Sequence, residues 1–340
     1  MTALATEQDI ASIPKIELHV HFGGSVSEET ATGLARHQGL DPSAVLPLVD
    51  GRYLSRYDDF SHFLRTLIAV SDLIRTPDDV ETVAAAFARA QASQGIVYTE
   101  VIVTALTHVR AGVEPRELWA ALRAGFAAGG PDTRIAIVVD AIRDYGPSDL
   151  GSTVRLVEAA DAPIVGLGLT GTEGTWPVEE FAFIRREADR LGLGVEVHAG
   201  EMGPPESIAA SLDLLGADRI GHGVAAADDP GLLDRLVRER VPLDVCPTSN
   251  VRIGLYPSLE AHPVATLWQA GANISISSDD PPLVGVTLAD ELRNVVRLAG
   301  LRREDLAMLQ RRAARSAFLP VAEQRELEAT IEEWVAGGPV

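Results

Sequence analysis

Eight short runs rich in Val, Ile and Leu recur along this chain of 340 residues, and amphipathic segments with helical spacing lie between them. Near-continuous apolar strands that alternate with helices are typical of a parallel sheet covered on both faces. Eight such units within about 300 residues favour a closed barrel over an open sheet. We therefore expect an α/β protein with the (β/α)₈ or TIM-barrel fold. The predicted strands span residues 15–22, 97–103, 134–142, 164–169, 193–198, 218–222, 242–247 and 273–278.

The segments between these strands predict helices of different lengths. Residues 178–191 place apolar side chains on one helical face, and residues 206–216 end on a glycine suited to a helix C-cap. The interval of about 23–95 is too long for a single crossover, so we expect a helical insertion there, after the first strand. One of its helices is predicted over residues 58–75, beside the mouth formed by the first strand.

The sequence predicts a single domain over residues 1–340. Residues from about 302 to 334 are expected to form helices that close the C-terminal end of the domain. We find no internal repeat, low-complexity segment or linker at which a second domain would begin. A doubly wound sheet is disfavoured because no G-x-G-x-x-G motif follows the first strand.

Charge and cysteine content exclude several classes of partner. The chain has 29 Lys plus Arg and 49 Asp plus Glu, and its formal charge of −20 disfavours nucleic acid and anionic membrane surfaces. Its one cysteine, Cys246, cannot form an intramolecular disulfide, and the N-terminus lacks the apolar core of a signal peptide. No segment approaches the roughly 18 apolar residues of a membrane helix. We expect a cytoplasmic protein that acts on a small molecule, with its oligomeric state open.

Polar side chains gather at the ends of predicted strands that lie far apart in the sequence. They are His19, His21, His198, Glu201, His222, Asp279 and Asp280. Strand residues two apart project from the same face, and the loops after barrel strands build active sites. A lone strand histidine is more often a hydrogen-bonded core residue, and an aspartate before proline is often a helix N-cap. The coincidence of these groups at several strand ends nevertheless predicts one common site.

Three imidazoles and a carboxylate in such a site suit a borderline divalent ion, above all Zn²⁺, with water in an open position. The metal lowers the pKa of that water and creates a nucleophile. A carboxylate and a histidine that are not ligands are then suited to proton transfer. The pattern therefore predicts a metal-dependent hydrolase.

Five short motifs connect these residues with a known family. They are Pro14-Lys15-Ile16-Glu17-Leu18-His19-Val20-His21, His198-Ala199-Gly200-Glu201, Arg219-Ile220-Gly221-His222-Gly223, Cys246-Pro247-Thr248-Ser249-Asn250 and Ser278-Asp279-Asp280-Pro281. In order and spacing the chain resembles the adenosine deaminase family of the amidohydrolase superfamily. The resemblance covers residues of about 12–330.

The resemblance implies one zinc ion per chain, held by His19, His21, His198 and Asp279. It also implies that Glu201 protonates N1 of a 6-aminopurine while water activated by the metal attacks C6. His222 would orient that water and stabilise the developing charge, with help from Asp279. Ammonia then leaves and a 6-oxopurine remains.

The resemblance further implies contacts with the substrate. Asp280 is expected to accept a hydrogen bond at N7, and Gly171 matches the family glycine whose backbone approaches N3. His21 and Gly23 are expected to face the substrate as well. Binuclear relatives bridge two metals with a carboxylated lysine on a mid-barrel strand. The only lysine here, Lys15, lies at the very start of the first strand and not on a mid-barrel strand, so a mononuclear site is favoured.

Two departures from the family pattern bear on the substrate. Adenosine deaminases usually carry an aspartate, and adenine deaminases a glutamate, where this chain has Gly23. An aspartate that commonly precedes the N3-contacting glycine by three residues is here Gly168. Glycine at position 23 opens space and removes negative charge, which favours a nucleoside with a bulky or acidic 5′ extension. The menaquinone-pathway intermediate 6-aminodeoxyfutalosine, which bears a benzoate, is one such compound. Candidate partners for that carboxylate are Arg52, Arg56, Arg65 and Arg75.

Other functions remain open from the sequence. One is an adenosine or 2′-deoxyadenosine deaminase, and another is a mononuclear metal hydrolase that acts on a lactone, amide or ester. A third is a binding protein without catalysis, which would be expected to lack a ligand or the proton donor. Glu201 and Asp280 favour a deaminase, because a purine ring uses both groups.

Overall fold

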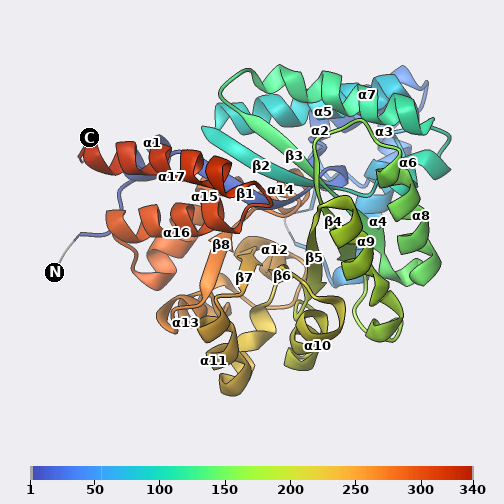
Figure 1. Cartoon of the computed structure of the whole chain (residues 1–340). Helices are drawn as coiled ribbons and strands as arrows, with labels where there is room; N and C mark the ends of the chain where they lie inside the picture. The colour runs from blue at the N-terminus through green and yellow to red at the C-terminus, as the bar shows by residue number, and fades with distance from the viewer. Residues whose placement is uncertain (1–2, 55, 339–340) are drawn as a thin grey trace.

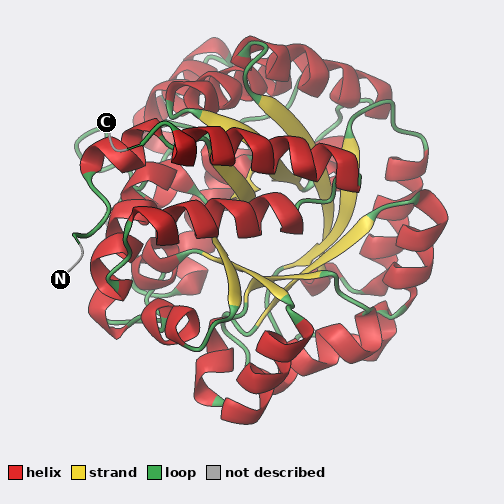
Figure 2. Ribbon diagram, turned by 60° about the vertical axis from the view of Figure 1, so that its left-hand side comes forward, coloured by secondary structure: helices red, strands yellow, loops and turns green. Residues whose placement is uncertain are grey.

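The computed structural model describes residues 3–54 and 56–338, and its eight parallel strands form one sheet in chain order. Each strand pairs with the next, and a bridge between Val20 and Asp279 joins the last strand to the first. The nearly closed barrel is ringed by helices (Figure 2), so the predicted fold is confirmed. The strands are β1 (Lys15–His21), β2 (Ile96–Val103), β3 (Arg134–Ile142), β4 (Ile164–Thr170), β5 (Gly194–Ala199), β6 (Arg219–His222), β7 (Pro242–Val245) and β8 (Asn273–Ile276).

Helices stand between the strands and at both ends of the chain (Figure 1). The first part contains α1 (Glu7–Ser12), η1 (Gly23–Ser25), α2 (Glu28–His37), α3 (Pro42–Val45), α4 (Phe60–Ser71), α5 (Pro77–Ser93), α6 (Ala105–Arg110), α7 (Pro115–Phe126), η2 (Ala127–Gly129), η3 (Arg143–Tyr145) and α8 (Pro147–Glu158), where η denotes a 3₁₀ helix. The second part contains η4 (Val178–Phe181), α9 (Phe183–Leu191), α10 (Pro205–Leu215), η5 (Val224–Asp228), α11 (Pro230–Glu239), α12 (Pro247–Arg252), η6 (Leu259–Ala261), α13 (Val264–Gln269), α14 (Pro281–Val284), α15 (Leu288–Ala299), α16 (Arg303–Ser316) and α17 (Val321–Ala336).

The helices agree with most of the predicted segments. The insertion after β1 contains α2 to α5, and α4 falls inside the helix predicted over 58–75. The predicted helix over 206–216 is α10, and the closing helices are α16 and α17. The segment 178–191 is not one helix, because it divides into η4 and α9 at Ala182. In the part of the chain that the structure covers, no helix is long and apolar enough for a membrane crossing.

Local signals explain where helices begin. The hydroxyl of Thr76 accepts the backbone N–H of Asp79, and the Asp79 carboxylate accepts the backbone N–H of Thr76. This reciprocal capping box satisfies two of the N–H groups that a helix start leaves unpaired. Thr287 and Asp290 form the same arrangement at the start of α15.

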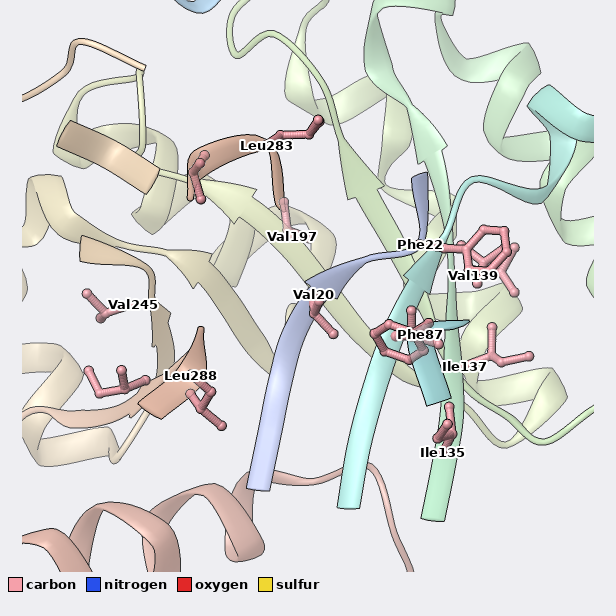
Figure 3. Close-up of a cluster of buried hydrophobic side chains, with 14 of the residues drawn as sticks. Val20, Phe22, Phe87, Ile135, Ile137, Val139, Val197, Val245, Leu283 and Leu288 are labelled. Atoms are coloured by element: carbon pink, nitrogen blue, oxygen red, sulfur yellow. The ribbon is translucent and has the colours of Figure 1, made fainter. Parts of the chain in front are cut away.

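The main core lies between the outer face of the barrel and the helices. Ile135, Ile137 and Val139 alternate along β3 and point into a cluster that includes Phe87 of α5 (Figure 3). Because successive strand residues face opposite sides, Asp140 points away from that cluster, toward the barrel interior. The outer face of the barrel therefore packs against the helices, and the inner face can carry the polar side chains of a site.

The ends of the chain meet on one side of the barrel. The C-terminal helices α16 and α17 pack together, and α16 also contacts β1 and β8 (Figure 1). A second apolar cluster forms there from Tyr98 and Ala136 of the barrel and small residues of α16. The opposite, carboxyl ends of the strands carry the predicted site residues.

Candidate active site

A cavity of about 320 Å³ opens at the carboxyl ends of the strands, where the predicted site residues gather. His19 is fully buried and does not line it. The other predicted site residues all do: His21, Gly23, Gly171, His198, Glu201, His222, Asp279 and Asp280. One wall is apolar and comes from α4, with the side chains of Phe60, Phe63, Leu64, Leu67 and Ile68.

Three histidines and one aspartate form a compact cluster at the base of the cavity. Nε2 of His21 lies 3.2 Å from Nε2 of His198 and 3.4 Å from Oδ1 of Asp279. Nε2 of His19 lies 3.6 Å from the same Asp279 oxygen and has no hydrogen-bond partner among the described residues. The His21–His198 contact is a hydrogen bond if one of the two nitrogens carries a proton, and if both are bare a shared cation would remove the repulsion of their lone pairs.

These separations fit a small divalent ion. A five-coordinate zinc centre with metal–ligand distances of about 2.0–2.1 Å would place neighbouring ligand atoms about 2.9–3.6 Å apart and leave one position for water. The pKa shifts of three of the four residues fit as well. Burial lowers the pKa of His21 and of His198, whereas the neighbouring histidines outweigh burial and hold the pKa of Asp279 well below its usual range. The fourth residue, His19, differs, because Asp279 and Glu196 outweigh burial and raise its pKa, so a metal bound at its Nε2 would displace a proton. Neutral imidazoles and an ionised carboxylate are the forms that bind a metal.

A buried ionic layer lies beneath this cluster and orients His19. Nδ1 of His19 lies 2.7 Å from Oε1 of Glu196, so its Nε2 is the nitrogen left for a metal. Glu196 accepts in turn from the Arg219 guanidinium at 2.8 Å, which also pairs with Glu100 and Asp244 at 2.6 Å. All these side chains are within the barrel and essentially unexposed. Outer-sphere carboxylates of this kind fix the tautomer of a ligating histidine.

The backbone is strained at two residues of the site. His222 and Asp279 adopt left-handed conformations with φ of 62° and 66°. Such a conformation costs roughly 1 kcal/mol for a residue other than glycine. Asp279 is held by the closure of the barrel, since its backbone N–H donates to the carbonyl of His19 and its carbonyl accepts from the N–H of His21. The closure of the barrel therefore positions the Asp279 carboxylate, and the backbone of Asp279 is strained as a result.

A hydrogen-bond chain sets the tautomer of His222. The backbone N–H of Val264 donates to Nδ1 of His262, so neutral His262 carries its proton on Nε2 and donates to Oδ1 of Asn250. The amide group of Asn250 then faces Nδ1 of His222 at 3.3 Å and Oε1 of Glu201 at 3.2 Å. Burial lowers the pKa of His222 to about 3. A neutral His222 that accepts at Nδ1 carries its proton on Nε2.

Two carboxyl groups beside the cluster are suited to donate protons. Burial, Asp279 and Glu173 raise the pKa of Glu201 well above its usual range. Because Oε1 of Glu201 accepts from Asn250, its proton belongs on Oε2. Burial and Asp279 likewise raise the pKa of Asp280, whose Oδ1 has no partner among the described residues. A protonated Asp280 would donate to an acceptor such as a purine N7, whereas the sequence-based expectation is that it accepts a hydrogen bond there.

At Gly168, where the family commonly has an aspartate, a side chain of the neighbouring strand occupies the space that the aspartate would take. Asp140 pairs with Gly168 across β3 and β4, and a Cβ at Gly168 would lie 2.9 Å from the Asp140 Cβ. The Asp140 carboxylate lines the cavity and accepts from the hydroxyl of Thr170 at 2.5 Å. An acidic side chain is therefore present close to this position, but it comes from β3.

Several residues of the site were not predicted from the sequence. Glu196 precedes His198 by two residues on β5, so the period of a strand could have placed both on one face. Asn250 belongs to a motif noted above, but nothing in that motif indicates its link to His262. Asp140 and the apolar wall of α4 carry no local signal, because only the closed barrel brings them to the cavity.

Comparisons with known proteins agree with this arrangement. Residues 14–334 match the family model described as Adenosine deaminase. The chain is 35% identical over 336 residues to the aminodeoxyfutalosine deaminase of Streptomyces avermitilis, which covers 96% of this chain and 92% of that protein. It is also 35% identical over 317 residues to the adenine deaminase of Streptomyces coelicolor, which covers 90% of this chain and 91% of that protein.

A solved structure shares the fold along its whole length. The crystal structure of an adenine deaminase from Arthrobacter aurescens superposes with a TM-score of 0.88 at 29% identity. The match covers 96% of this chain and 100% of that one. The barrel, its insertion and its closing helices are thus a shared architecture.

Proposed function

The chain belongs to the adenosine deaminase family, and from that premise we propose that it catalyses zinc-dependent hydrolytic deamination of a 6-aminopurine nucleoside. The family's enzymes are hydrolases of carbon–nitrogen bonds, and the relatives named above deaminate aminopurine-type substrates. In the proposed reaction water replaces the 6-amino group, and the products are a 6-oxopurine and ammonia. The preferred substrate carries a large 5′ substituent, as 6-aminodeoxyfutalosine does.

One observation carries the deaminase proposal. A protonated Glu201, a neutral His222 and the cluster of His21, His198 and Asp279 all line one cavity. A zinc ion held by the four proposed ligands supplies a nucleophile by lowering the pKa of a water molecule. Attack at C6 also needs an acid at the ring nitrogen next to it. The pairing of a metal site with a buried carboxylic acid meets both requirements.

The remaining groups are suited to hold a purine. Glu201 donates its Oε2 proton to N1, which makes C6 more electrophilic. Asp280 donates to N7 from the opposite edge of the ring system, and the backbone at Gly171 approaches N3. Gly171 has φ of 90°, and a Cβ there would lie 2.3 Å from Oδ2 of Asp144, so a side chain is excluded. His222 orients the nucleophile with its Nε2–H.

The size and lining of the cavity support a substituted purine. Cavities of about 300 Å³ or more accommodate drug-sized ligands, whereas adenine has only ten heavy atoms. The apolar wall of α4 offers a surface for a hydrophobic or aromatic 5′ group. Gly23 and Ser71 both line the cavity, and a Cβ at Gly23 would lie 2.7 Å from the Ser71 hydroxyl oxygen. A side chain at position 23 would therefore need the Ser71 hydroxyl to rotate away, and the widening of the pocket by glycine stays a prediction.

The proposed arginine partners are also misplaced. Arg52, Arg56, Arg65 and Arg75 are all exposed and none lines the cavity. Within the described ranges 3–54 and 56–338, no lysine or arginine lines it at all. A carboxylate at the end of a 5′ extension would therefore have to reach solvent. This observation favours adenine as a second candidate substrate, because adenine has no acidic group to place.

The first experiment is an ultraviolet assay of the zinc-loaded protein. The panel consists of adenosine, 2′-deoxyadenosine, adenine, 5′-methylthioadenosine and 6-aminodeoxyfutalosine. We expect the highest kcat/KM for a compound with a 5′ substituent. A higher value for adenine would favour the second candidate, and a higher value for adenosine would mean that another group binds the 5′-hydroxyl. No turnover of any compound would reject the proposal.

Two variants test the binding surfaces. Leu67→Asn places an amide on the apolar wall and should lower kcat/KM for 6-aminodeoxyfutalosine while leaving adenine unaffected. Leu214→Asn, on the exposed face of α10, is the matched control and should change neither value. His198→Ala should lose stoichiometric zinc by elemental analysis. Retention of one zinc per chain in that variant would contradict the proposed coordination.

A further inference from the structure

Glu173 lies on the loop after β4 and binds the loop after β5 through its carboxylate. Its two oxygens accept hydrogen bonds from four consecutive backbone N–H groups, with N···O distances of 2.9, 2.9, 3.0 and 2.9 Å, those of Gly200, Glu201, Met202 and Gly203. Oε1 accepts from the last three, and Oε2 accepts from the first. One side chain therefore binds every N–H of the turn that carries Glu201.

The turn is shaped to receive this carboxylate. The hydroxyl of Ser207 at the start of α10 donates to Oε2 of Glu173 at 2.6 Å. A Cβ at Gly203 would lie 2.3 Å from the same oxygen, so only glycine leaves room for it. Glu173 is half-buried and does not line the cavity.

The other contacts of the turn's main chain are at its first residue, where the Gly200 N–H also donates to the Ser207 hydroxyl and the Gly200 carbonyl accepts from the N–H of Ala225. Asn250 binds one oxygen of the Glu201 side chain, and among the described residues it makes no hydrogen bond to the main chain of the turn. Backbone N–H groups that lose their acceptor exchange it for water and gain conformational freedom. A proton donor that moves by about 1 Å loses much of its rate advantage.

We infer that Glu173 is a positioning residue that fixes the main chain of residues 200–203 and thereby holds Glu201 against the substrate. The inference rests on the proposed function, in which Glu201 is the proton donor. It concerns a residue that touches neither substrate nor metal ligands. Glu173 acts only through the turn that it binds.

The first test is Glu173→Gln in the zinc-loaded protein. Glutamine keeps the size of the side chain, but its NH₂ group cannot accept the N–H bonds that one carboxylate oxygen receives. We expect zinc content to stay at the wild-type level, kcat to fall at least tenfold and KM to change less than threefold. A wild-type kcat, or a loss confined to KM, would overturn the inference.

A double-mutant cycle separates positioning from a general structural effect. In a Glu201→Gln background the proton donor is already absent, so Glu173→Gln should cause almost no further loss of kcat. An equal loss in both backgrounds would show that Glu173 acts independently of Glu201. That result would overturn the inference even if the single variant is impaired.

Hydrogen exchange tests the same contact without relying on activity. In Glu173→Gln the amides of residues 200–203 should exchange at least tenfold faster, with little change elsewhere. The matched control is Asp229→Asn, since Asp229 caps the N–H groups of Gly231 and Leu232 on α11, outside the cavity. Because asparagine still accepts both N–H groups through its carbonyl oxygen, this control should leave exchange unchanged over 200–203 and at its own helix start. Unchanged exchange over 200–203 in Glu173→Gln would overturn the inference.

A second variant removes the contact without altering Glu173. Gly203→Ala should displace the flexible carboxylate from the turn and reproduce both the loss of kcat and the faster exchange. Wild-type behaviour of Gly203→Ala would contradict the proposed geometry. If the wild-type protein deaminates none of the test compounds, the proposed function fails, whereas the exchange measurements still decide whether Glu173 holds the turn.

Discussion

Nδ1 of His19 lies 2.7 Å from Oε1 of Glu196, and both side chains are buried inside the barrel. This contact leaves Nε2 as the free nitrogen of His19. Burial disfavours the Glu196 carboxylate, but Arg219 and His19 outweigh that effect and lower its pKa to about 2. The group that orients His19 is thus a permanent anion. It also adds negative charge near a site built for a cation.

Glu196→Gln should weaken zinc binding while the four proposed ligands remain in place. A neutral amide still accepts from His19 but no longer polarises it, and changes of this kind cost about 10–100-fold in metal affinity. Chelator competition on the folded protein measures the effect. Asp149→Asn is the control, since it removes a buried carboxylate paired with Arg110 away from the cluster. Wild-type zinc affinity in Glu196→Gln would refute the role.

Glu201→Gln should keep zinc and fold but lose about 10²–10⁴-fold in kcat, the usual contribution of a general acid. Because the pKa of Glu201 is raised, wild-type activity should persist at neutral pH and decline as pH rises through that pKa. Steady-state kinetics across pH measure both effects. The exposed acid Glu206 provides the control, and Glu206→Gln should behave as wild type. Equal activity in Glu201→Gln would exclude it as the donor.

Asn250→Asp should impair catalysis by reversing the tautomer of His222. An aspartate cannot donate to Nδ1 of His222, so the imidazole would carry its proton there and present a bare Nε2 to the cavity. We expect kcat to fall at least tenfold with zinc retained. Asn273→Asp, at the other end of the barrel where Asn273 donates to the carbonyl of Arg240, should have no effect. An unaltered kcat in Asn250→Asp would contradict the hydrogen-bond chain.

Glu291 should make the stability of the protein depend on pH. Burial raises its pKa from 4.5 to about 8 in the folded state, so the fold favours the protonated form. Wild type should therefore lose stability as pH rises between these values, relative to Glu291→Gln, which does not titrate. The loss in the free energy of unfolding over this whole pH range is at most about 5 kcal/mol. Urea unfolding at pH 5 and pH 8 measures it, with exposed Glu304→Gln as the control. A pH-independent difference would refute this prediction.

The pattern of apolar runs was enough to predict the barrel and the strands to within a few residues. Strand residues such as Ile135, Ile137 and Val139 are apolar because helices cover them, so their burial is visible in the sequence. The division of the segment 178–191 was not visible. Its apolar spacing continues through Ala182, where the backbone changes from a 3₁₀ helix to an α-helix.

The polar cluster at the strand ends was predictable because each member stands at the end of a strand. The contacts around it depend on three-dimensional closure. Ser71 fills the space beside Gly23 from a helix in the insertion, and Asp140 fills the space beside Gly168 from the next strand. No local pattern reports which distant side chain enters a gap left by glycine. Substrate preference is determined at such gaps, and it was the least predictable property.

The bridge between Val20 and Asp279, which joins the last strand to the first, also has a consequence for biosynthesis. His19 and His21 leave the ribosome early, whereas Asp279 follows only when most of the chain has been made. An incomplete nascent chain therefore cannot assemble the full ligand set, and the metal gives it no comparable stabilisation. Since a bound ion stabilises only the state that holds it, a metal ion bound at the proposed site would stabilise the finished barrel alone. Metal loading would thus act as a late checkpoint that distinguishes complete molecules from truncated ones.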